Sequence, residues 1–113
     1  MSDLTKKRCK ACEGNIDPME HGEIEKHLEE IDGWKSVDDH HITKSYEFDD
    51  FRQALDFVNA VGAIAEDQGH HPDILLMYGK VELTYFTHSI DGLHENDFIM
   101  AAKSDECYEK YFD

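Results

Sequence analysis

An amphipathic segment from about residue 50 to residue 67 constrains the fold of this chain most strongly. Its apolar residues form two adjacent stripes at helical spacing, namely Phe51, Leu55, Val58 and Ala65 on one and Ala54, Phe57, Val61 and Ile64 on the other. Asp49 or Asp50 can cap the start of the helix, and Gly69 can end it. Because its apolar face is so wide, we expect this helix to lie across a sheet or a second subunit.

Two pairs of strand-like segments flank this helix. Trp34–Val37 and Ile42–Phe48 precede it and are separated by a turn at Asp38-Asp39. Ile74–Tyr78 and Val81–His88 follow it and are separated by a turn at Gly79-Lys80. Alternating apolar and polar residues, rich in β-branched and aromatic types, predict strands with one buried face. Such short links predict two hairpins.

Two further helices complete the predicted fold. The first spans residues 19 to 32, with Ile24, Leu28 and Ile31 on one face and Gly33 as its C-cap. The last begins near Asn96 and runs towards Phe112. The order α-β-β-α-β-β-α predicts an α+β fold, in which a four-stranded antiparallel sheet carries three helices on one face. The other face is left to meet water or another protomer.

The size and charge of the chain limit its partners. Its 113 residues suit one domain, which we place at residues 19–113 after a polar arm at residues 1–18. The formal net charge is −15 and no basic patch is visible, so we expect no direct nucleic acid binding. No apolar run approaches the roughly 20 residues that span a bilayer, and no secretory signal is recognisable, so we expect no membrane association.

The cysteines indicate a reducing compartment. Three cysteines are an odd number, which argues against a disulfide framework and favours a cytoplasmic location. Cys9 and Cys12 form a C-x-x-C pair in the arm. A structural zinc site needs four ligands, and no second pair follows. We therefore interpret Cys9 and Cys12 as a local thiol pair that binds no cofactor.

Histidines mark the candidate site. Of eight histidines, His70, His71, His88 and His94 fall between the central helix and the last one, and the first three are the candidates for a site. Glu66 and His70 are four residues apart at a helix end and can share a face, whereas His71 points elsewhere. Asp97, in the first turn of the last helix, can accept an imidazole N–H or bind a substrate donor. Another pair, His40-His41, lies at a polar turn, where we expect solvated side chains.

Three histidines with carboxylates beside them admit three interpretations. They could hold zinc or iron with an open position, but adjacent side chains diverge in an extended chain and no H-x-H or H-x-x-x-H spacing is present. They could perform metal-free acid–base catalysis, because the ordinary pKa of imidazole is about 6.5 and each positioned group contributes about 10²–10⁴ in rate. They could also be ordinary polar loop residues.

The spacing of these residues resembles a known signature. Glu66-x-x-x-His70-His71-Pro72 is followed after five residues by Tyr78, after nine more by His88 and after eight more by Asp97-Phe98. This pattern resembles that of the pterin-4a-carbinolamine dehydratases, and the likeness covers about residues 19 to 103. The arm resembles bacterial members that begin with a C-x-x-C segment. One departure is His94, where many relatives carry a threonine that could cap the last helix.

The resemblance implies a dehydratase that needs no metal and no organic cofactor. It implies loss of water from a 4a-hydroxytetrahydropterin to give the quinonoid dihydropterin, which recycles the cofactor of aromatic amino-acid hydroxylases such as phenylalanine hydroxylase. It also implies a homodimer or homotetramer. His70, His71 and His88 fall on the family's active-site histidines, and Glu66 and Asp97 on its substrate-binding carboxylates. We assign His70 and His88 as the acid–base pair and His71 to positioning the pterin.

Two alternatives come from other functional classes. Animal relatives of this family also act as transcriptional co-regulators, so the chain could be a non-catalytic dimerisation or co-regulator module. The chain could also be a metal-binding protein that uses the histidine cluster. The intact histidine trio favours catalysis, because a pure binding module does not need it.

Overall fold

The computed structural model describes residues 3–10 and 16–112 of the chain. In sequence order its elements are the 3₁₀ helix η1 (Asp3–Lys6), α1 (His21–Leu28), β1 (Lys35–Val37), β2 (His41–Glu47), α2 (Phe51–Gln68), β3 (Asp73–Met77), β4 (Lys80–Tyr85), the 3₁₀ helix η2 (His88–Ile90) and α3 (Glu95–Tyr111). The predicted order α-β-β-α-β-β-α is confirmed. Within the described residues, no helix combines the length and the apolar character needed to cross a bilayer.

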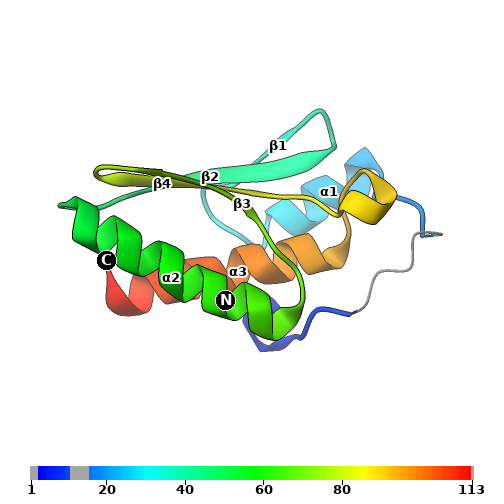
Figure 1. Ribbon diagram of the computed structural model, residues 1–113. Coiled ribbons are helices and arrows are strands. Elements are labelled where there is room, and N and C mark those ends of the chain that lie inside the picture. The colour runs from blue at the N-terminus through cyan, green and yellow to red at the C-terminus, as the bar shows by residue number, and fades with distance from the viewer. Residues whose placement is uncertain (1–2, 11–15, 113) are drawn as a thin grey trace.

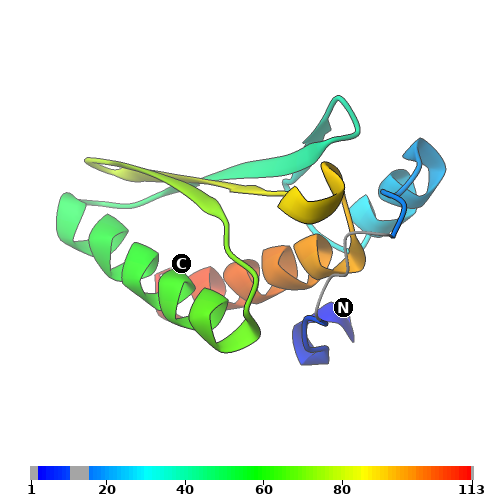
Figure 2. The same cartoon turned by 45° about the vertical axis from the view of Figure 1, so that its right-hand side comes forward.

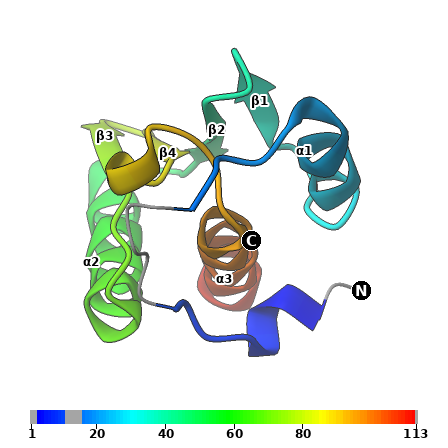
Figure 3. The same cartoon turned by 90° about the vertical axis from the view of Figure 1, so that its right-hand side faces the viewer.

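The four strands form one antiparallel sheet in the order β1-β2-β4-β3. All three α-helices lie on one face of this sheet, with α2 and α3 beneath it and α1 beside them (Figures 1 and 3). This confirms the predicted α+β fold. The apolar segment after α2 does form a strand, but β3 is an edge strand and Ile74, Leu75 and Met77 are exposed on it.

Local sequence signals explain the position of α2. The Asp50 side chain accepts a hydrogen bond of 2.9 Å from the backbone N–H of Gln53, and Gly69 ends the helix in the left-handed conformation with φ 69°. The buried residues of this helix are Ala54, Phe57, Val61 and Ala65. The buried face is narrower than we predicted, because Phe51 lies at its flank and is 43% exposed.

The first helix is shorter than predicted. It ends at Leu28 with Glu29 as its C-cap, so the predicted C-cap role of Gly33 is wrong. The chain continues in tight turns, in which the N–H of Ile31 bonds to the carbonyl of Leu28 at 3.3 Å. These turns carry Ile31 into the core. Gly33 is still needed in the left-handed conformation, φ 79°, to start the approach to β1.

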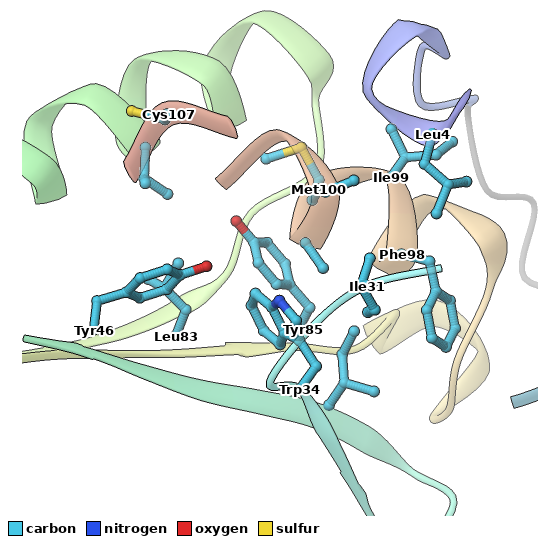
Figure 4. Close-up of a cluster of buried hydrophobic side chains, with 14 of the residues drawn as sticks. Leu4, Ile31, Trp34, Tyr46, Leu83, Tyr85, Phe98, Ile99, Met100 and Cys107 are labelled. Atoms are coloured by element: carbon cyan, nitrogen blue, oxygen red, sulfur yellow. The ribbon is translucent and has the colours of Figure 1, made fainter. Parts of the chain in front are cut away.

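The core lies between the sheet and the helices (Figure 4). Trp34 packs against Tyr85, with ring centroids 5.8 Å apart, and its indole N–H donates to the carboxylate of Asp105 at 3.0 Å. Leu4 of η1 is 2% exposed and lies next to Ile99 of α3. The described part of the polar arm therefore packs against the domain, on the side of α3 that faces away from the sheet (Figures 2 and 3).

Candidate active site

The three histidines singled out in the sequence line one pocket. His70 and His71 follow the glycine that ends α2, and His88 is the first residue of η2. Together they border a cavity of about 550 Å³. Its other walls come from five parts of the chain, with Lys10 from the arm, Gln68 and Gly69 from the end of α2, Pro72 and Asp73 after it, Phe86, Thr87 and Ser89 around η2, and Asn96 from α3. A cavity of this size is in the range that binds small organic molecules.

His70 is held by a buried carboxylate. Its Nε2–H donates to Oδ1 of Asp97 at 2.6 Å, and the side chain of Asp97 is fully buried. The other oxygen, Oδ2, accepts from the hydroxyl of Thr87 at 2.9 Å and from the backbone N–H of His94 at 3.0 Å. The prediction that Asp97 accepts an imidazole N–H is confirmed. Because Nε2 is engaged, Nδ1 is the nitrogen of His70 that remains for a ligand.

His71 is held by an exposed carboxylate. Its Nε2–H donates to Oε2 of Glu66, and the two side chains are 57% and 79% exposed. The expectation that Glu66 shares a face with His70 is therefore wrong: its partner is the next residue. The physical reason is Gly69, whose left-handed backbone ends the helix before His70, so helical i,i+4 spacing no longer applies.

His88 reaches the pocket from a closed turn rather than from a strand. We predicted a strand up to His88, but β4 ends at Tyr85. The backbone groups of Thr87 and Gly92 pair with each other, with the N–H of Thr87 2.8 Å from the carbonyl of Gly92, and close a small loop that contains η2. Since the Thr87 hydroxyl also donates to Asp97, this loop and His70 are attached to the same carboxylate.

An aromatic stack supports the ring of His88. That ring lies against Phe86, with centroids 4.1 Å apart, and Phe86 lies against His40, with centroids 4.7 Å apart. His40 also bonds through Nε2 to Asp91 at 2.8 Å, which connects the β1–β2 turn to the end of η2. The expectation that His40 and His41 are solvated is wrong, since both are partly buried and bond to each other through Nδ1 at 3.0 Å.

Sequence reasoning missed Phe86, His40 and Asp91 as neighbours of the site. Phe86 stands two residues before His88, and residues two apart in a strand lie on the same face, so the predicted strand could have indicated this contact. However, β4 ends at Tyr85, before either residue. No signal existed for His40 and Asp91, because 51 residues separate them.

The start of α3 tolerates the unusual residue at position 94. Nδ1 of His94 accepts a hydrogen bond of 3.1 Å from the backbone N–H of Asn96, and Asp97 completes a capping box. His94 therefore caps the helix itself, so the departure from the family pattern at this position leaves the helix start intact. The cap also fixes Asp97 at the position from which it reaches His70.

The possible metal ligands among the described residues form no cluster. Among residues 3–10 and 16–112, no three His, Cys, Asp or Glu side chains are grouped so that they could hold a metal ion. Cys9 and Cys107 are free thiols, and burial raises the pKa of Cys9 to about 11. Cys12 lies outside the described residues, so our interpretation of the C-x-x-C pair stays a prediction.

Comparisons with known proteins converge on one family. Residues 17–107 match the family model described as "Pterin 4 alpha carbinolamine dehydratase". A Rubrobacter xylanophilus protein named "Putative pterin-4-alpha-carbinolamine dehydratase" is 50% identical over 105 residues, which cover 93% of this chain and 98% of the relative. A protein of the same name from Alkaliphilus metalliredigens is 43% identical over 107 residues, covering 94% of this chain and 96% of the relative.

Two solved structures share the fold. A crystal structure of a protein described as a transcriptional coactivator/pterin dehydratase from Brucella melitensis matches with a TM-score of 0.76 and 35% identity, over 80% of this chain and 98% of that one. A pterin dehydratase-like protein described as a RuBisCO assembly factor in the alpha-carboxysome matches with a TM-score of 0.57 over 66% of this chain and 88% of that one. At 23% identity, the second likeness concerns the fold alone.

Proposed function

The chain belongs to the pterin-4-alpha-carbinolamine dehydratase family, and from that premise we propose that it removes water from 4a-hydroxytetrahydropterins by histidine acid–base catalysis. The product is the quinonoid dihydropterin. In this proposal His70 and His88 are the acid–base pair, His71 positions the pterin, and Glu66 and Asp97 act on the substrate side through the imidazoles that they bind.

One observation supports this proposal most. His70, His71 and His88 border a single cavity, and the carboxylate that binds His70 also binds the Thr87 hydroxyl next to His88. The His70 imidazole and the backbone segment that carries His88 therefore share one buried anchor, which favours a fixed separation of the two imidazoles, as proton transfer at two atoms of one substrate requires. Phe86 offers an aromatic wall for a flat bicyclic ring.

The reaction needs two proton transfers and no net redox change. One imidazolium donates a proton to the hydroxyl on C4a while the C4a–O bond breaks, so water leaves. The lone pair of N5 forms the C4a=N5 double bond, and the N5 proton passes to a neutral imidazole. Each of these groups contributes about 10²–10⁴ in rate when it is correctly placed. The two histidines exchange protons with solvent between turnovers.

Decay of the 4a-carbinolamine, followed by stopped-flow absorbance at neutral pH, tests this function. The wild-type protein should accelerate decay far above the spontaneous rate. A variant with both His70→Ala and His88→Ala should lose this acceleration and keep its circular dichroism spectrum. Full turnover by that double variant would remove the mechanism, and no acceleration by the wild-type protein would remove the function.

Two alternatives give different results in the same assay. A co-regulator module, suggested by the description of the Brucella protein as a transcriptional coactivator, should not accelerate decay although the pocket is intact. A metal-dependent protein should lose its activity after chelation and regain it when the metal is restored. We expect activity to survive chelation, with elemental analysis carried out on the same sample.

The proposal includes a homodimer or homotetramer, a cytoplasmic location and a functional link to a hydroxylase such as phenylalanine hydroxylase. The exposed apolar residues of the edge strand support self-association, because Leu75 is 52% and Tyr78, just after β3, is 70% exposed. The free thiols of Cys9 and Cys107 are in keeping with a reducing compartment. Sedimentation velocity gives the oligomeric state directly.

A further inference from the structure

Positive charge is concentrated at the N-terminal end of this acidic chain. Residues 1–10 hold four of its 11 Lys and Arg residues, namely Lys6, Lys7, Arg8 and Lys10. All but one of its 26 acidic residues lie after residue 10. An anionic ligand approaching the rest of the molecule meets repulsion, whereas the arm attracts it.

Specific hydrogen bonds attach Cys9 and Lys10 of the arm to the rim of the candidate site. The backbone N–H of Lys10 donates to Oδ1 of Asn96 at 2.9 Å, and the Asn96 amide donates back to the Lys10 carbonyl at 2.6 Å. The N–H of Cys9 donates to Oε1 of Gln68 at 2.9 Å. Asn96 is only 2% exposed, so this pairing is part of the packed structure.

The two anchors of the arm stand beside functional residues. Gln68 precedes His70 by two residues, and Asn96 immediately precedes Asp97. The arm therefore bridges the two segments that meet in the His70–Asp97 hydrogen bond. Residues 3–10 of the arm lie before residues 17–107, which match the family model, so Lys10 adds a wall to the pocket of the matched region.

The cations of the arm are used differently. Lys7 pairs with Glu95 at 2.9 Å and Arg8 with Asp67 at 3.3 Å, and these contacts dock the arm on the acidic surface. Lys10 lines the pocket, and within the described part of the chain its ammonium forms no ion pair. Lys10 also helps to lower the pKa of Glu95 through its charge, but none of the described carboxylates forms an ion pair with it. A cation that borders a pocket in this way is suited to an anion on a ligand.

We propose that Lys10 is a substrate-binding residue and that its ammonium binds an anionic group, a carboxylate or a phosphate, on the C6 substituent of the pterin. This deepens the proposed function and rests on it. C6 is bonded to N5, so a C6 substituent begins two bonds from a reacting atom, and Lys10 borders the same pocket as the three histidines. The arm thereby selects among pterin side chains.

Two fluorescent pterins that differ in charge at C6 test the inference. Pterin-6-carboxylate carries the anion, and 6-hydroxymethylpterin is its neutral counterpart of similar size. We expect Lys10→Gln to weaken binding of the carboxylate about tenfold, as for loss of a hydrogen bond to a charged group, and binding of the hydroxymethyl compound less than twofold. The matched control is Lys6→Gln, which removes the same charge from the arm away from the pocket and should change neither affinity.

The results separate this inference from the proposed function. An equal loss for both pterins, or an unchanged affinity for the carboxylate, overturns the role of Lys10. A loss of the same size in Lys6→Gln also overturns it, because general attraction by the arm then suffices. The dehydration assay on the wild-type protein with a neutral substrate is independent: turnover without carboxylate selectivity leaves the function standing and Lys10 refuted. Carboxylate selectivity without turnover would leave the role of Lys10 standing and refute the proposed function.

Discussion

The consecutive residues His70 and His71 each bind a carboxylate, but the two imidazole–carboxylate pairs differ in environment. The side chains of His70 and Asp97 are 11% and 0% exposed, whereas those of His71 and Glu66 are 57% and 79% exposed. Asp97 accepts three hydrogen bonds and Glu66 one that links it to a histidine. The same chemical pair therefore serves as an internal anchor in one case and as a solvated contact in the other.

We expect this difference in burial to decide how much each pair contributes to stability. Exposed ion pairs contribute about 0–1 kcal/mol because water and salt screen them. Removing one partner of a buried pair costs about 3–5 kcal/mol, because the remaining polar groups lose their only partner away from water. Asp97 holds His70, the η2 loop and the start of α3 together, so its loss should spread through the whole site.

The largest expected effect is on stability. Asp97→Ala should lower the free energy of unfolding by about 3 kcal/mol or more, and Glu66→Ala by less than about 0.5 kcal/mol. Urea denaturation followed by tryptophan fluorescence measures both, since Trp34 is the only tryptophan and is buried. Equal losses of unfolding free energy in the two variants would contradict the claim that burial decides how much each pair contributes.

An intermediate effect, on kcat, is expected from the aromatic stack that supports His88. Its ring packs on Phe86, which packs on His40, and His40 is tied to Asp91. We expect His40→Ala to lower kcat about tenfold through looser placement of His88, while the unfolding midpoint changes little. A change in KM alone would argue against a positioning role.

A matched control for that variant is His21→Ala. His21 also bonds to an aspartate, Asp39, at 2.9 Å, but it is exposed and does not line the pocket. Its activity should equal that of the wild-type protein. If His21→Ala lowers kcat as much as His40→Ala does, the aromatic stack is not the cause.

The smallest expected effect comes from another exposed pair, Lys7–Glu95. The hydrogen bond from Lys7 holds the pKa of Glu95 below its usual value of 4.5. A carboxyl group with a lowered folded-state pKa contributes stability above its ordinary pKa and loses it as pH falls through the folded-state value. The free energy of unfolding should therefore decline below about pH 4.5 in both proteins. The decline should be smaller in Glu95→Gln than in the wild-type protein, by a few tenths of a kcal/mol, as measured by urea denaturation at several pH values. A large difference at pH 7 would show that exposure does not limit the pair.

The sequence predicted the elements whose signals are local. Each of these signals lies within a few residues of the helix or strand that it defines. Examples are the caps of α2 at Asp50 and Gly69, the buried stripe of that helix and the alternating pattern of β4. The role of Asp97 as an acceptor for an imidazole was also predicted, because its position in the first turn of α3 follows from the helix start.

The remainder depends on contacts between distant residues. The Lys10–Asn96 pairing spans 86 positions and the His40–Asp91 bond spans 51, and neither has a local signature. The early end of α1 follows from burial of Ile31, and the early end of β4 from the Thr87–Gly92 closure. Both are tertiary effects that override a helical or alternating pattern.

The most direct test of this account compares two isosteric variants in the same stopped-flow assay of 4a-carbinolamine decay. Asp97→Asn and Glu66→Gln each replace one carboxylate by an amide of nearly the same shape. We predict that Asp97→Asn lowers the enzyme-dependent rate by about a hundredfold or more, whereas Glu66→Gln lowers it less than about tenfold. Equal losses, or a larger loss in Glu66→Gln, would contradict the claim that the buried His70–Asp97 pair anchors catalysis.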